Sequence, residues 1–207
     1  MRIAIFASGG GSNAEAIIRA ASEGRLSAEV GLVVSNNADA GVLQRAKVLE
    51  VNYTTIDQRN FDSEDSYINA LFNVLDENGI DFIALAGYLK LVQPKLINKY
   101  KNKITNIHPA LLPSFGGKGF YGKNVHKAVL EAGCKVSGVT IHLVSESYDR
   151  GPIISQLTVP VLEDDNPESL AARVLKVEHQ IYPEALQLFA EGRVKVINNI
   201  MTIKDKV

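Results

Sequence analysis

Apolar residues in the first half of the chain form short continuous runs separated by longer segments of mixed character. These runs occupy residues 2–7, 30–35, 51–56 and 81–86. A short, nearly unbroken apolar run predicts a strand that is buried on both faces, as strands are in a parallel sheet. We therefore expect buried strands at residues 2–7, 30–35 and 81–86, and a more polar strand near an edge of the sheet at residues 51–56.

The segments between these runs carry apolar residues at helical spacing. They predict helices over residues 14–21, 41–49, 61–77 and 94–100, with Asn60 as the cap of the third. Strands that alternate with helices in this way form right-handed crossovers in a doubly wound, mostly parallel sheet with a Rossmann-like α/β fold. In such a sheet, ligands bind beyond the carboxyl ends of the strands.

The second half of the chain has a different pattern. A short strand is expected at residues 104–107, a helix at 125–132, and an antiparallel pair of strands at 137–144 and 152–161. Further along, Asn166 and Pro167 mark the start of a helix that runs to about Glu191, with Pro183 expected to kink it. Residues 194–203 predict a strand or hairpin. Since no linker or repeat interrupts the pattern, we predict a single domain over residues 1–207, with halves at about 1–100 and 101–207.

Composition narrows the class of protein. The chain has 207 residues, of which 46% are hydrophobic and 22% charged, and a formal net charge of -1. This charge argues against a nonspecific nucleic-acid partner, which would favour a basic excess. A single cysteine, Cys134, excludes an intramolecular disulfide and a cysteine-rich zinc site. No signal peptide and no run of about 18 apolar residues is present, so we expect a cytoplasmic protein without a membrane partner.

A glycine loop follows the first predicted strand directly. It comprises Ser8, the three glycines 9–11, Ser12 and Asn13, and a predicted helix follows. Backbone N–H groups exposed in a glycine loop at a helix N-terminus favour the binding of a phosphate group. The loop matches neither the dinucleotide nor the mononucleotide fingerprint. The alternative is a tight turn with Ser12 or Asn13 as a ligand-free helix cap.

Asn106 and His108 stand two residues apart at the end of the strand predicted at 104–107, and Pro109 and Pro113 follow them. Alternate residues of a strand share a face. A carboxamide beside an imidazole suits an oxyanion donor and a proton carrier. The alternative is that Asn106 caps the turn and that His108 is a structural, buried histidine whose ring nitrogens are hydrogen-bonded.

Asp149 lies in a polar loop between the two antiparallel strands and offers a carboxylate to the imidazole. Such a carboxylate is expected to raise the pKa of His108. No serine or cysteine occupies a nucleophile-elbow pattern, so the nucleophile is expected to come from a substrate. No metal is expected, because His126, His142 and His179 are scattered, and His142 is interpreted as structural.

Three motifs occur in one order along nearly the whole chain: the glycine loop, the stretch from Asn106 to Pro113, and the segment His142-x6-Asp149-x-Gly-Pro. Together they resemble the folate-dependent formyltransferases, in particular the branch that formylates glycinamide ribonucleotide in purine biosynthesis. The resemblance implies a single formyltransferase domain that takes 10-formyltetrahydrofolate as formyl donor and glycinamide ribonucleotide as acceptor. It implies no metal and no nucleic-acid partner, and a monomer or homodimer.

The same resemblance assigns roles to individual residues. It makes Asn106, His108 and Asp149 the catalytic residues. The residues implied in ribotide binding are Gly11, Ser12, Asn13 and Glu178. The residues implied in folate binding, besides Asn106, are Leu89, Lys90, Leu91, Val92, Ser145, Glu146, Ser147, Tyr148 and Asp149. Glu64 stands where some members have a basic residue near the folate tail, and the glycine-rich loop 115–122 also departs from many members. The Leu112–Pro113 bond aligns with one that is cis in some members.

The implied reaction is direct attack of the ribotide amine on the formyl carbon, with Asn106 and protonated His108 stabilising the oxyanion and Asp149 assisting. The alternatives are a formyltetrahydrofolate hydrolase, an enzyme that formylates methionyl-tRNA, or a non-catalytic sugar-phosphate-binding protein of the same fold. The tRNA alternative is disfavoured by the net charge of -1.

Overall fold

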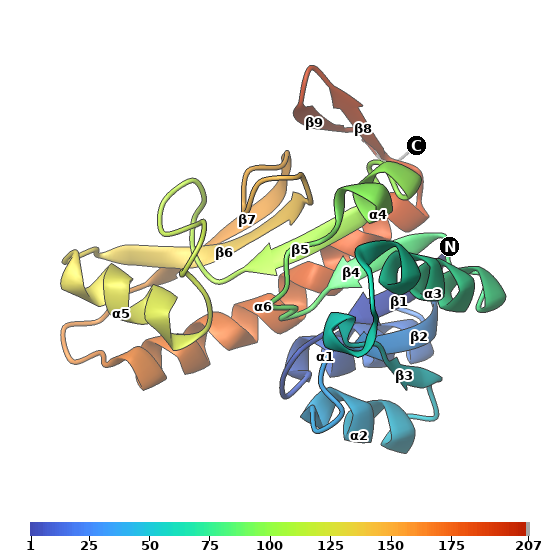
Figure 1. The fold of residues 1–207 in the computed structure, drawn as a ribbon. Helices are drawn as coiled ribbons and strands as arrows, with labels where there is room; N and C mark the ends of the chain where they lie inside the picture. The colour runs from blue at the N-terminus through green and yellow to red at the C-terminus, as the bar shows by residue number, and fades with distance from the viewer. Residues whose placement is uncertain (206–207) are drawn as a thin grey trace. The chain divides into compact units, whose positions relative to one another are not determined.

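Strands and helices alternate along the first half of the computed structural model, which describes residues 1–205 (Figure 1). The elements are β1 (Arg2–Phe6), α1 (Ser12–Ser22), β2 (Glu29–Ser35), α2 (Gly41–Val48), β3 (Tyr53–Thr55), the 3-10 turn Gln58–Asn60, α3 (Glu64–Glu77), β4 (Phe82–Leu85) and α4 (Pro94–Lys99). Each of the four predicted strands and four predicted helices is present. The chain separates into two compact units, of which the first is Met1–Thr105.

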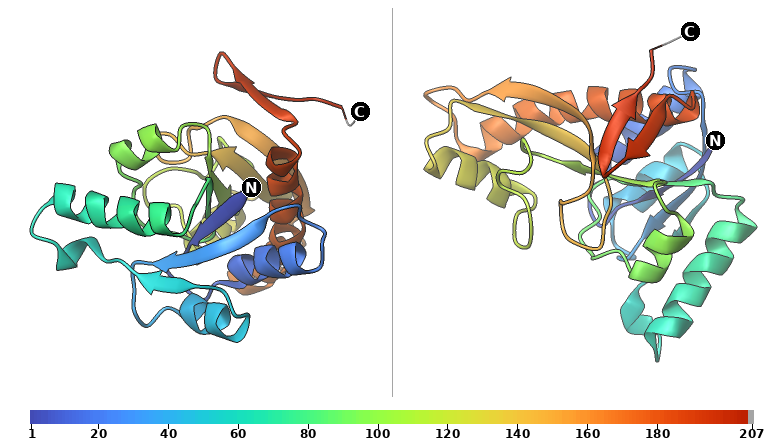
Figure 2. Two further views of the ribbon diagram at one scale, coloured as in Figure 1. Left: turned by 90° about the vertical axis from the view of Figure 1, so that its right-hand side faces the viewer. Right: turned by 90° about the horizontal axis from the view of Figure 1, so that it is seen from above.

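The first unit is built around parallel strands. β1 pairs with both β2 and β4, and β2 pairs with β3, all in parallel. Helices α1 and α2 cover one face of these strands and α3 lies on the other (Figure 2), as right-handed crossovers in both directions require. Strands β1, β2 and β4 are apolar because both of their faces are covered, and Ile3, Ile5 and Ile83 are fully buried. The edge strand β3 is more polar and largely exposed.

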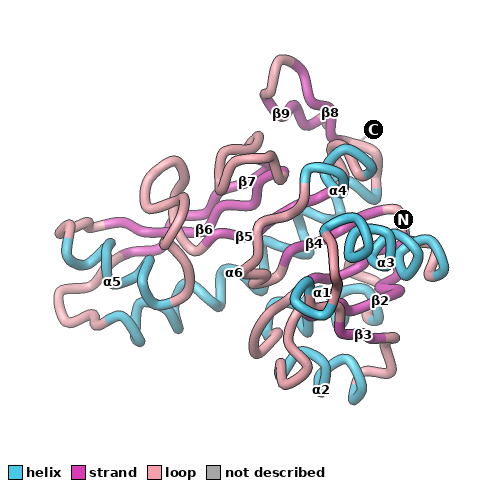
Figure 3. The backbone as a smooth tube through the Cα atoms, in the orientation of Figure 1, coloured by secondary structure: helices cyan, strands magenta, loops and turns pink. Residues whose placement is uncertain are grey.

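The second unit begins at Asn106 and carries the antiparallel part of the fold. Its elements are α5 (Lys123–Glu131), β6 (Val136–Leu143), β7 (Ile153–Pro160), α6 (Pro167–Ala190), β8 (Val194–Ile197) and β9 (Ile200–Ile203). β5 (Ile104–His108) spans the boundary in the sequence. β6 pairs antiparallel with β7, and β8 with β9 as a hairpin. Figure 3 shows the long loop between β5 and α5.

The strand order is β3-β2-β1-β4-β5-β6-β7, with β8-β9 as a separate two-stranded sheet. This mixed, mostly parallel sheet with an antiparallel C-terminal part confirms the predicted fold class. The prediction of one domain over residues 1–207 stays a prediction.

The predicted cap of α3 is wrong, and the alternative cap of α1 by Ser12 or Asn13 is not found. Helix α3 starts at Glu64 with Ser63 as its cap, and Ser63 and Ser66 form a capping box. Asn60 instead ends the 3-10 turn. Helix α1 starts after Gly11, which has a left-handed conformation and gives no side-chain cap. In contrast, α6 begins as predicted, with Asn166 as cap and Pro167 in the first turn.

Candidate functional site

The candidate catalytic residues come from two segments of the second unit. Asn106 and His108 lie on β5 and, as alternate residues of a strand, share a face. Asp149 lies in the connection between β6 and β7, where its φ of 53° is left-handed. Aspartate tolerates this conformation better than most residues, but it is a strained one that is common at functional sites. The side chains of all three residues meet, so the structure brings the predicted group together.

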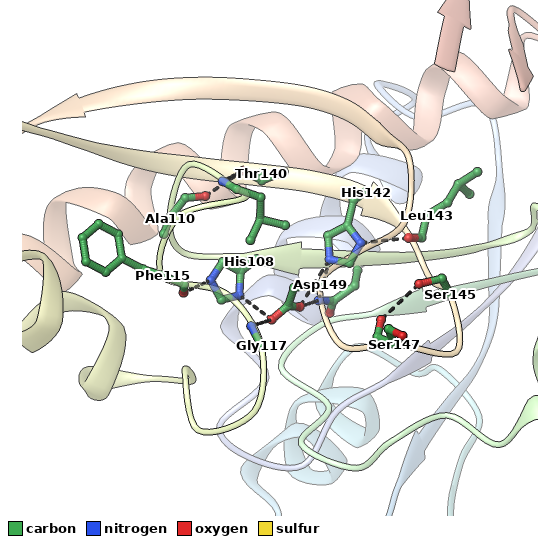
Figure 4. Close-up of polar contacts among 12 residues, drawn as sticks. His108, Ala110, Phe115, Gly117, Thr140, His142, Leu143, Ser145, Ser147 and Asp149 are labelled. Atoms are coloured by element: carbon green, nitrogen blue, oxygen red, sulfur yellow. Dashed lines mark hydrogen bonds and ion pairs between the residues drawn. The ribbon is translucent and has the colours of Figure 1, made fainter. Parts of the chain in front are cut away.

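His108 is 3% exposed and has a partner for each ring nitrogen. Its Nε2 lies 2.7 Å from the carbonyl oxygen of Phe115 and its Nδ1 lies 3.6 Å from Oδ2 of Asp149 (Figure 4). A carbonyl oxygen only accepts, so Nε2 carries a proton. In the neutral ring, Nδ1 is then the free lone pair, and it faces the carboxylate.

The carboxylate of Asp149 contacts several groups. Its Oδ2 accepts a hydrogen bond from the Gly117 amide at 2.8 Å. Its Oδ1 lies 3.5 Å from both Nδ2 of Asn106 and Nε2 of His142. Burial alone would raise the pKa of Asp149, but contact with His142, the Gly117 hydrogen bond and the charge of the histidines together lower the pKa below its usual value. The carboxylate is therefore ionised at neutral pH.

The pKa of His108 is lowered, which corrects the prediction that a carboxylate would raise it. Burial disfavours the charged ring and is the largest effect. Asp149 and the Phe115 carbonyl favour the imidazolium but do not overcome burial, and the charge of His142 adds to the lowering. In the ligand-free protein, His108 is therefore mainly neutral at neutral pH.

His142 contacts this group, although its strand pattern suggested a structural role. It is 2% exposed and lies on β6. Its Nε2 is 3.1 Å from Nδ2 of Asn106 and its Nδ1 is 2.8 Å from the carbonyl oxygen of Leu143. The one available sequence signal was the histidine seven residues before Asp149 in the family motif.

The turn after β5 is held by a side chain of β6. Thr140 donates to the carbonyl of Ala110 at 2.7 Å and accepts from the amide of Leu112 at 3.0 Å. Gln156 donates to Thr140 and to the carbonyl of Leu112. The Leu112–Pro113 bond in this turn is cis. These bonds fix the path of the chain from His108 into the glycine-rich loop.

The glycine-rich loop supplies backbone groups to the site through Phe115 and Gly117. Gly116, between them, is packed so closely that an added Cβ would overlap Leu112 and lie 3.2 Å from Cβ of Asp149. Only glycine fits there without displacing a neighbour. The side chains of Phe115 and Phe120 make an edge contact within the loop.

The first unit holds the predicted phosphate loop. Gly11 has a φ of 77°, and an added Cβ would lie 2.5 Å from side-chain atoms of Val42. Helix α2 holds the other two glycines, since the Val42 amide donates to the carbonyl of Gly9 and Arg45 Nε donates to that of Gly10. Among the described residues, no hydrogen bond is donated by the amides of Gly10, Gly11 or Ser12. The carbonyls of Gly9 and Gly10 thus face α2, and the amides of Gly10, Gly11 and Ser12 remain available to bind an anion.

The remaining predicted binding residues lie in separate segments. Leu89, Lys90, Leu91 and Val92 follow β4 in the first unit, where the Leu89 amide donates to Oγ of Ser8 at 2.9 Å. Leu89 and Leu91 are 54% and 45% exposed, so both side chains are accessible to a ligand. Residues 145–149 form a tight turn in the second unit, and Glu178 is buried on α6.

Within residues 1–205, no group of three or more His, Cys, Asp or Glu side chains is arranged to hold a metal ion. None of the described helices combines the length and apolar character that a bilayer crossing requires.

A buried histidine in contact with an aspartate and beside an asparagine, on a mixed α/β sheet with a glycine loop at a helix N-terminus, is typical of a group-transfer enzyme. The chain belongs to the formyl transferase family, whose model, described as "Formyl transferase", matches residues 1–186.

Relatives of named activity indicate the branch of the family. The chain is 44% identical over 195 residues to the chloroplastic phosphoribosylglycinamide formyltransferase of Arabidopsis thaliana, spanning 94% of this chain and 67% of that protein. It is 36% identical over 205 residues to the phosphoribosylglycinamide formyltransferase of Haemophilus influenzae, spanning 99% of this chain and 94% of that protein. Among solved structures, glycinamide ribonucleotide transformylase 1 from Symbiobacterium toebii has a TM-score of 0.93 and 41% identity, covering 99% of this chain and 94% of that one.

Proposed function

We propose that this protein transfers the formyl group of 10-formyltetrahydrofolate to the amine of glycinamide ribonucleotide, in the formation of purines. The observation that carries the proposal is the contact of ionised Asp149 with Asn106 and with buried His108, in a chain that belongs to the formyl transferase family. The near-complete overlap with relatives of that activity supports the choice of acceptor.

The reaction we propose is a direct transfer. The nitrogen lone pair of the ribotide amine attacks the formyl carbon, and the carbonyl π electrons move to oxygen to give a tetrahedral oxyanion. Asn106 donates to this oxyanion, because an amide N–H aimed at developing negative charge lowers the barrier. Collapse of the intermediate re-forms the carbonyl and breaks the bond to N10 of the folate, which takes a proton.

His108 and Asp149 carry out the proton transfers. The neutral imidazole has its Nε2–H bound to Phe115, so Nδ1 is the position that accepts the proton lost by the attacking amine. Protonation at Nδ1 places that proton between the ring and Oδ2 of Asp149, 3.6 Å away, either directly or through water. The resulting imidazolium stabilises the oxyanion by its charge and returns the proton to the leaving nitrogen.

The binding residues are part of the same proposal. Gly11, Ser12 and Asn13 would hold the ribotide phosphate through backbone amides at the N-terminus of α1. Leu89 to Val92 and residues 145–149 would enclose the pterin ring, and Glu178 would act near the ribotide. A single domain, a monomer or homodimer, and a cytoplasmic location remain predictions, as does the absence of a nucleic-acid partner.

Formyl transfer from 10-formyltetrahydrofolate tests the function, with the folate product followed by absorbance in the presence and absence of glycinamide ribonucleotide. We expect turnover only when the ribotide is present. Release of formate without the ribotide would instead identify a hydrolase. No turnover under either condition, in a protein that still binds the ribotide, would identify a sugar-phosphate-binding protein and overturn the proposal.

A further inference from the structure

His142 is a buried histidine that the proposed mechanism does not use. It lies on β6 and holds one group with each ring nitrogen: the Leu143 carbonyl oxygen at 2.8 Å from Nδ1, and Nδ2 of Asn106 at 3.1 Å from Nε2. Figure 4 shows the ring directed from β6 toward the group around Asp149. Because the ring is 2% exposed, water does not compete for these contacts.

The two partners determine where the ring carries its proton. The carbonyl oxygen of Leu143 can only accept, so Nδ1 must donate. The nitrogen of the Asn106 carboxamide can only donate, so Nε2 must accept. A proton on Nε2 would point at a donor 3.1 Å away, whereas the nearest acceptor on that side, Oδ1 of Asp149, is farther, at 3.5 Å. The distances therefore select the tautomer with the proton on Nδ1 and the lone pair on Nε2.

The Asp149 carboxylate fixes the orientation of the Asn106 carboxamide independently of His142, because Nδ2 of Asn106 lies 3.5 Å from Oδ1 of Asp149. If the amide were flipped, its oxygen would face this carboxylate, and two groups that only accept hydrogen bonds would be in contact. In the observed orientation, one N–H of Asn106 is bound by His142. The second N–H has only the long 3.5 Å contact with Asp149, so it remains available to a substrate oxygen.

The pairing of β6 with β7 is irregular at His142. In the ladder between β6 and β7, Ile141 pairs with Ser155, but His142 pairs with Ile153, so the register shifts between these two residues of β6. Such irregularities redirect side chains and are common beside active sites. Thr140, the preceding residue on the same face, binds the turn after β5. Two alternate residues of β6 thus hold the end of β5.

We infer that His142 is a positioning residue for the formyl transfer: it accepts a hydrogen bond from the Asn106 carboxamide and thereby aims the free N–H at the substrate oxyanion. The inference rests on the proposed function, because it assigns a task to Asn106 in that reaction. It predicts that His142 acts through Asn106 and not by itself.

A double-mutant cycle tests this coupling. The variants are Asn106→Ala, His142→Ala and the double variant, each assayed for formyl transfer. We expect His142→Ala to lower kcat by about tenfold to a hundredfold, within the range for a lost or misaligned oxyanion donor. The KM for each substrate should change less than about threefold. In the Asn106→Ala background, His142→Ala should have almost no further effect on kcat.

Two variants separate positioning from a structural effect. His142→Gln keeps an acceptor at the distance of Nε2, so it should retain more kcat than His142→Ala. Ser137→Ala removes a buried hydroxyl from the same strand, away from Asn106, and should leave kcat unchanged. Independent, multiplicative losses in the double-mutant cycle would overturn the inference, as would equal activity of the Gln and Ala variants.

The tautomer can be measured on the wild-type protein without substrates. Nitrogen-15 NMR of labelled histidine should show a proton on Nδ1 of His142 and a lone pair on Nε2. A proton on Nε2 would overturn the inference even if the enzyme transfers formyl groups as proposed. Failure of the wild-type protein to turn over would instead contradict the proposed function and leave the tautomer result valid.

Discussion

Gly11 is the residue of the glycine loop that tolerates substitution least. Its φ of 77° suits glycine, and an added Cβ would lie 2.5 Å from the side chain of Val42 and 2.7 Å from its Cα. Because a backbone atom is among the obstacles, a rotamer change cannot relieve the overlap. We expect Gly11→Ala to lower the free energy of unfolding by about 1–3 kcal/mol and to raise the KM for the ribotide at least about tenfold.

Gly9→Ala is the matched control for this prediction. An added Cβ at Gly9 has nothing within 4 Å, and its φ lies outside the left-handed region. Urea unfolding of both variants, combined with the KM for each substrate, separates the effects. Equal stability of the two variants would show that Val42 does not confine Gly11.

His108 carries the largest predicted effect on the chemical step. Removing the imidazole removes both the acceptor for the amine proton and the charge beside the oxyanion, so His108→Ala should lower kcat at least about a hundredfold. Circular dichroism should show an intact fold. Ser114→Ala, an exposed position in the following turn, serves as the control. Full activity in a folded His108→Ala protein would remove His108 from the mechanism.

The buried histidines predict how stability depends on pH. Burial lowers the pKa of both His108 and His126, so the unfolded chain binds more protons than the folded one between the lowered pKa and about 6.5. Stability should therefore fall as pH decreases below about 6.5, by at most about 1.4 kcal/mol per pH unit for each group. The lowered pKa of Asp149 contributes only at lower pH, below its usual value of 3.8.

Urea unfolding between about pH 5 and 7.5 measures this slope. His126→Gln removes one of the two groups and should make the slope smaller over that range. An unchanged slope would mean that His126 is not held in its neutral form by burial.

Two properties of the site could not be read from the sequence, and both depend on residues distant along the chain. The spacing of Asn106 and His108 predicted a shared face, but the extent of burial around His108, which reverses the expected pKa shift, depends on tertiary packing. His142 alternates with apolar neighbours, as core residues do. Its contact with Asn106 arises only when β5 and β6 come together, 36 residues apart.

At the scale of elements, α2 supports the predicted phosphate loop. Arg45 binds the Gly10 carbonyl at 2.8 Å and also contacts Glu15 on α1. This contact keeps the carbonyl turned away from the space in front of α1. We expect Arg45→Ala to raise the KM for the ribotide several-fold with little change in kcat, because it loosens the loop without touching the reacting atoms.

Lys47→Ala, an exposed position on the same helix, is the matched control for Arg45 and should leave the KM unchanged. Glycinamide riboside, which lacks the phosphate, provides a second comparison, since Arg45→Ala should not weaken it further. An equal loss for both acceptors would place the effect of Arg45 outside the phosphate loop.

Element types were predictable because the apolar patterns are strong, whereas helix starts were predictable only where cap chemistry was unambiguous. Asn166 with Pro167 marks the start of α6 correctly. For α3, the apolar spacing extends back to Phe61, which favoured Asn60 as cap, but a 3-10 turn intervenes and Ser63 is the cap. For α1, a glycine takes the cap position. Local patterns thus give the element, and competition among nearby capping groups decides its first residue.

At the scale of the whole molecule, the property to be predicted is whether residues 1–207 unfold in one cooperative transition. The chain clusters into two compact units with a boundary between Thr105 and Asn106, near the predicted boundary at about residue 100. Strand β5 crosses this boundary, since Ile104 and Thr105 belong to the first unit and Asn106 to His108 belong to the second. Because separating the units would break this strand, we predict one cooperative transition.

Thermal unfolding in the presence of ligands tests this prediction. The ribotide phosphate is assigned to the first unit, so in two independent units it would stabilise only one of two transitions. In one cooperative unit, ribotide at a hundred times its Kd adds about 2.7 kcal/mol to the whole protein, which should raise a single Tm by roughly 5–10 °C for a chain of this size. Calorimetry should then show one peak that either substrate shifts. Two peaks, with only one responding to the ribotide, would contradict the single domain and identify each half as a separate folding unit.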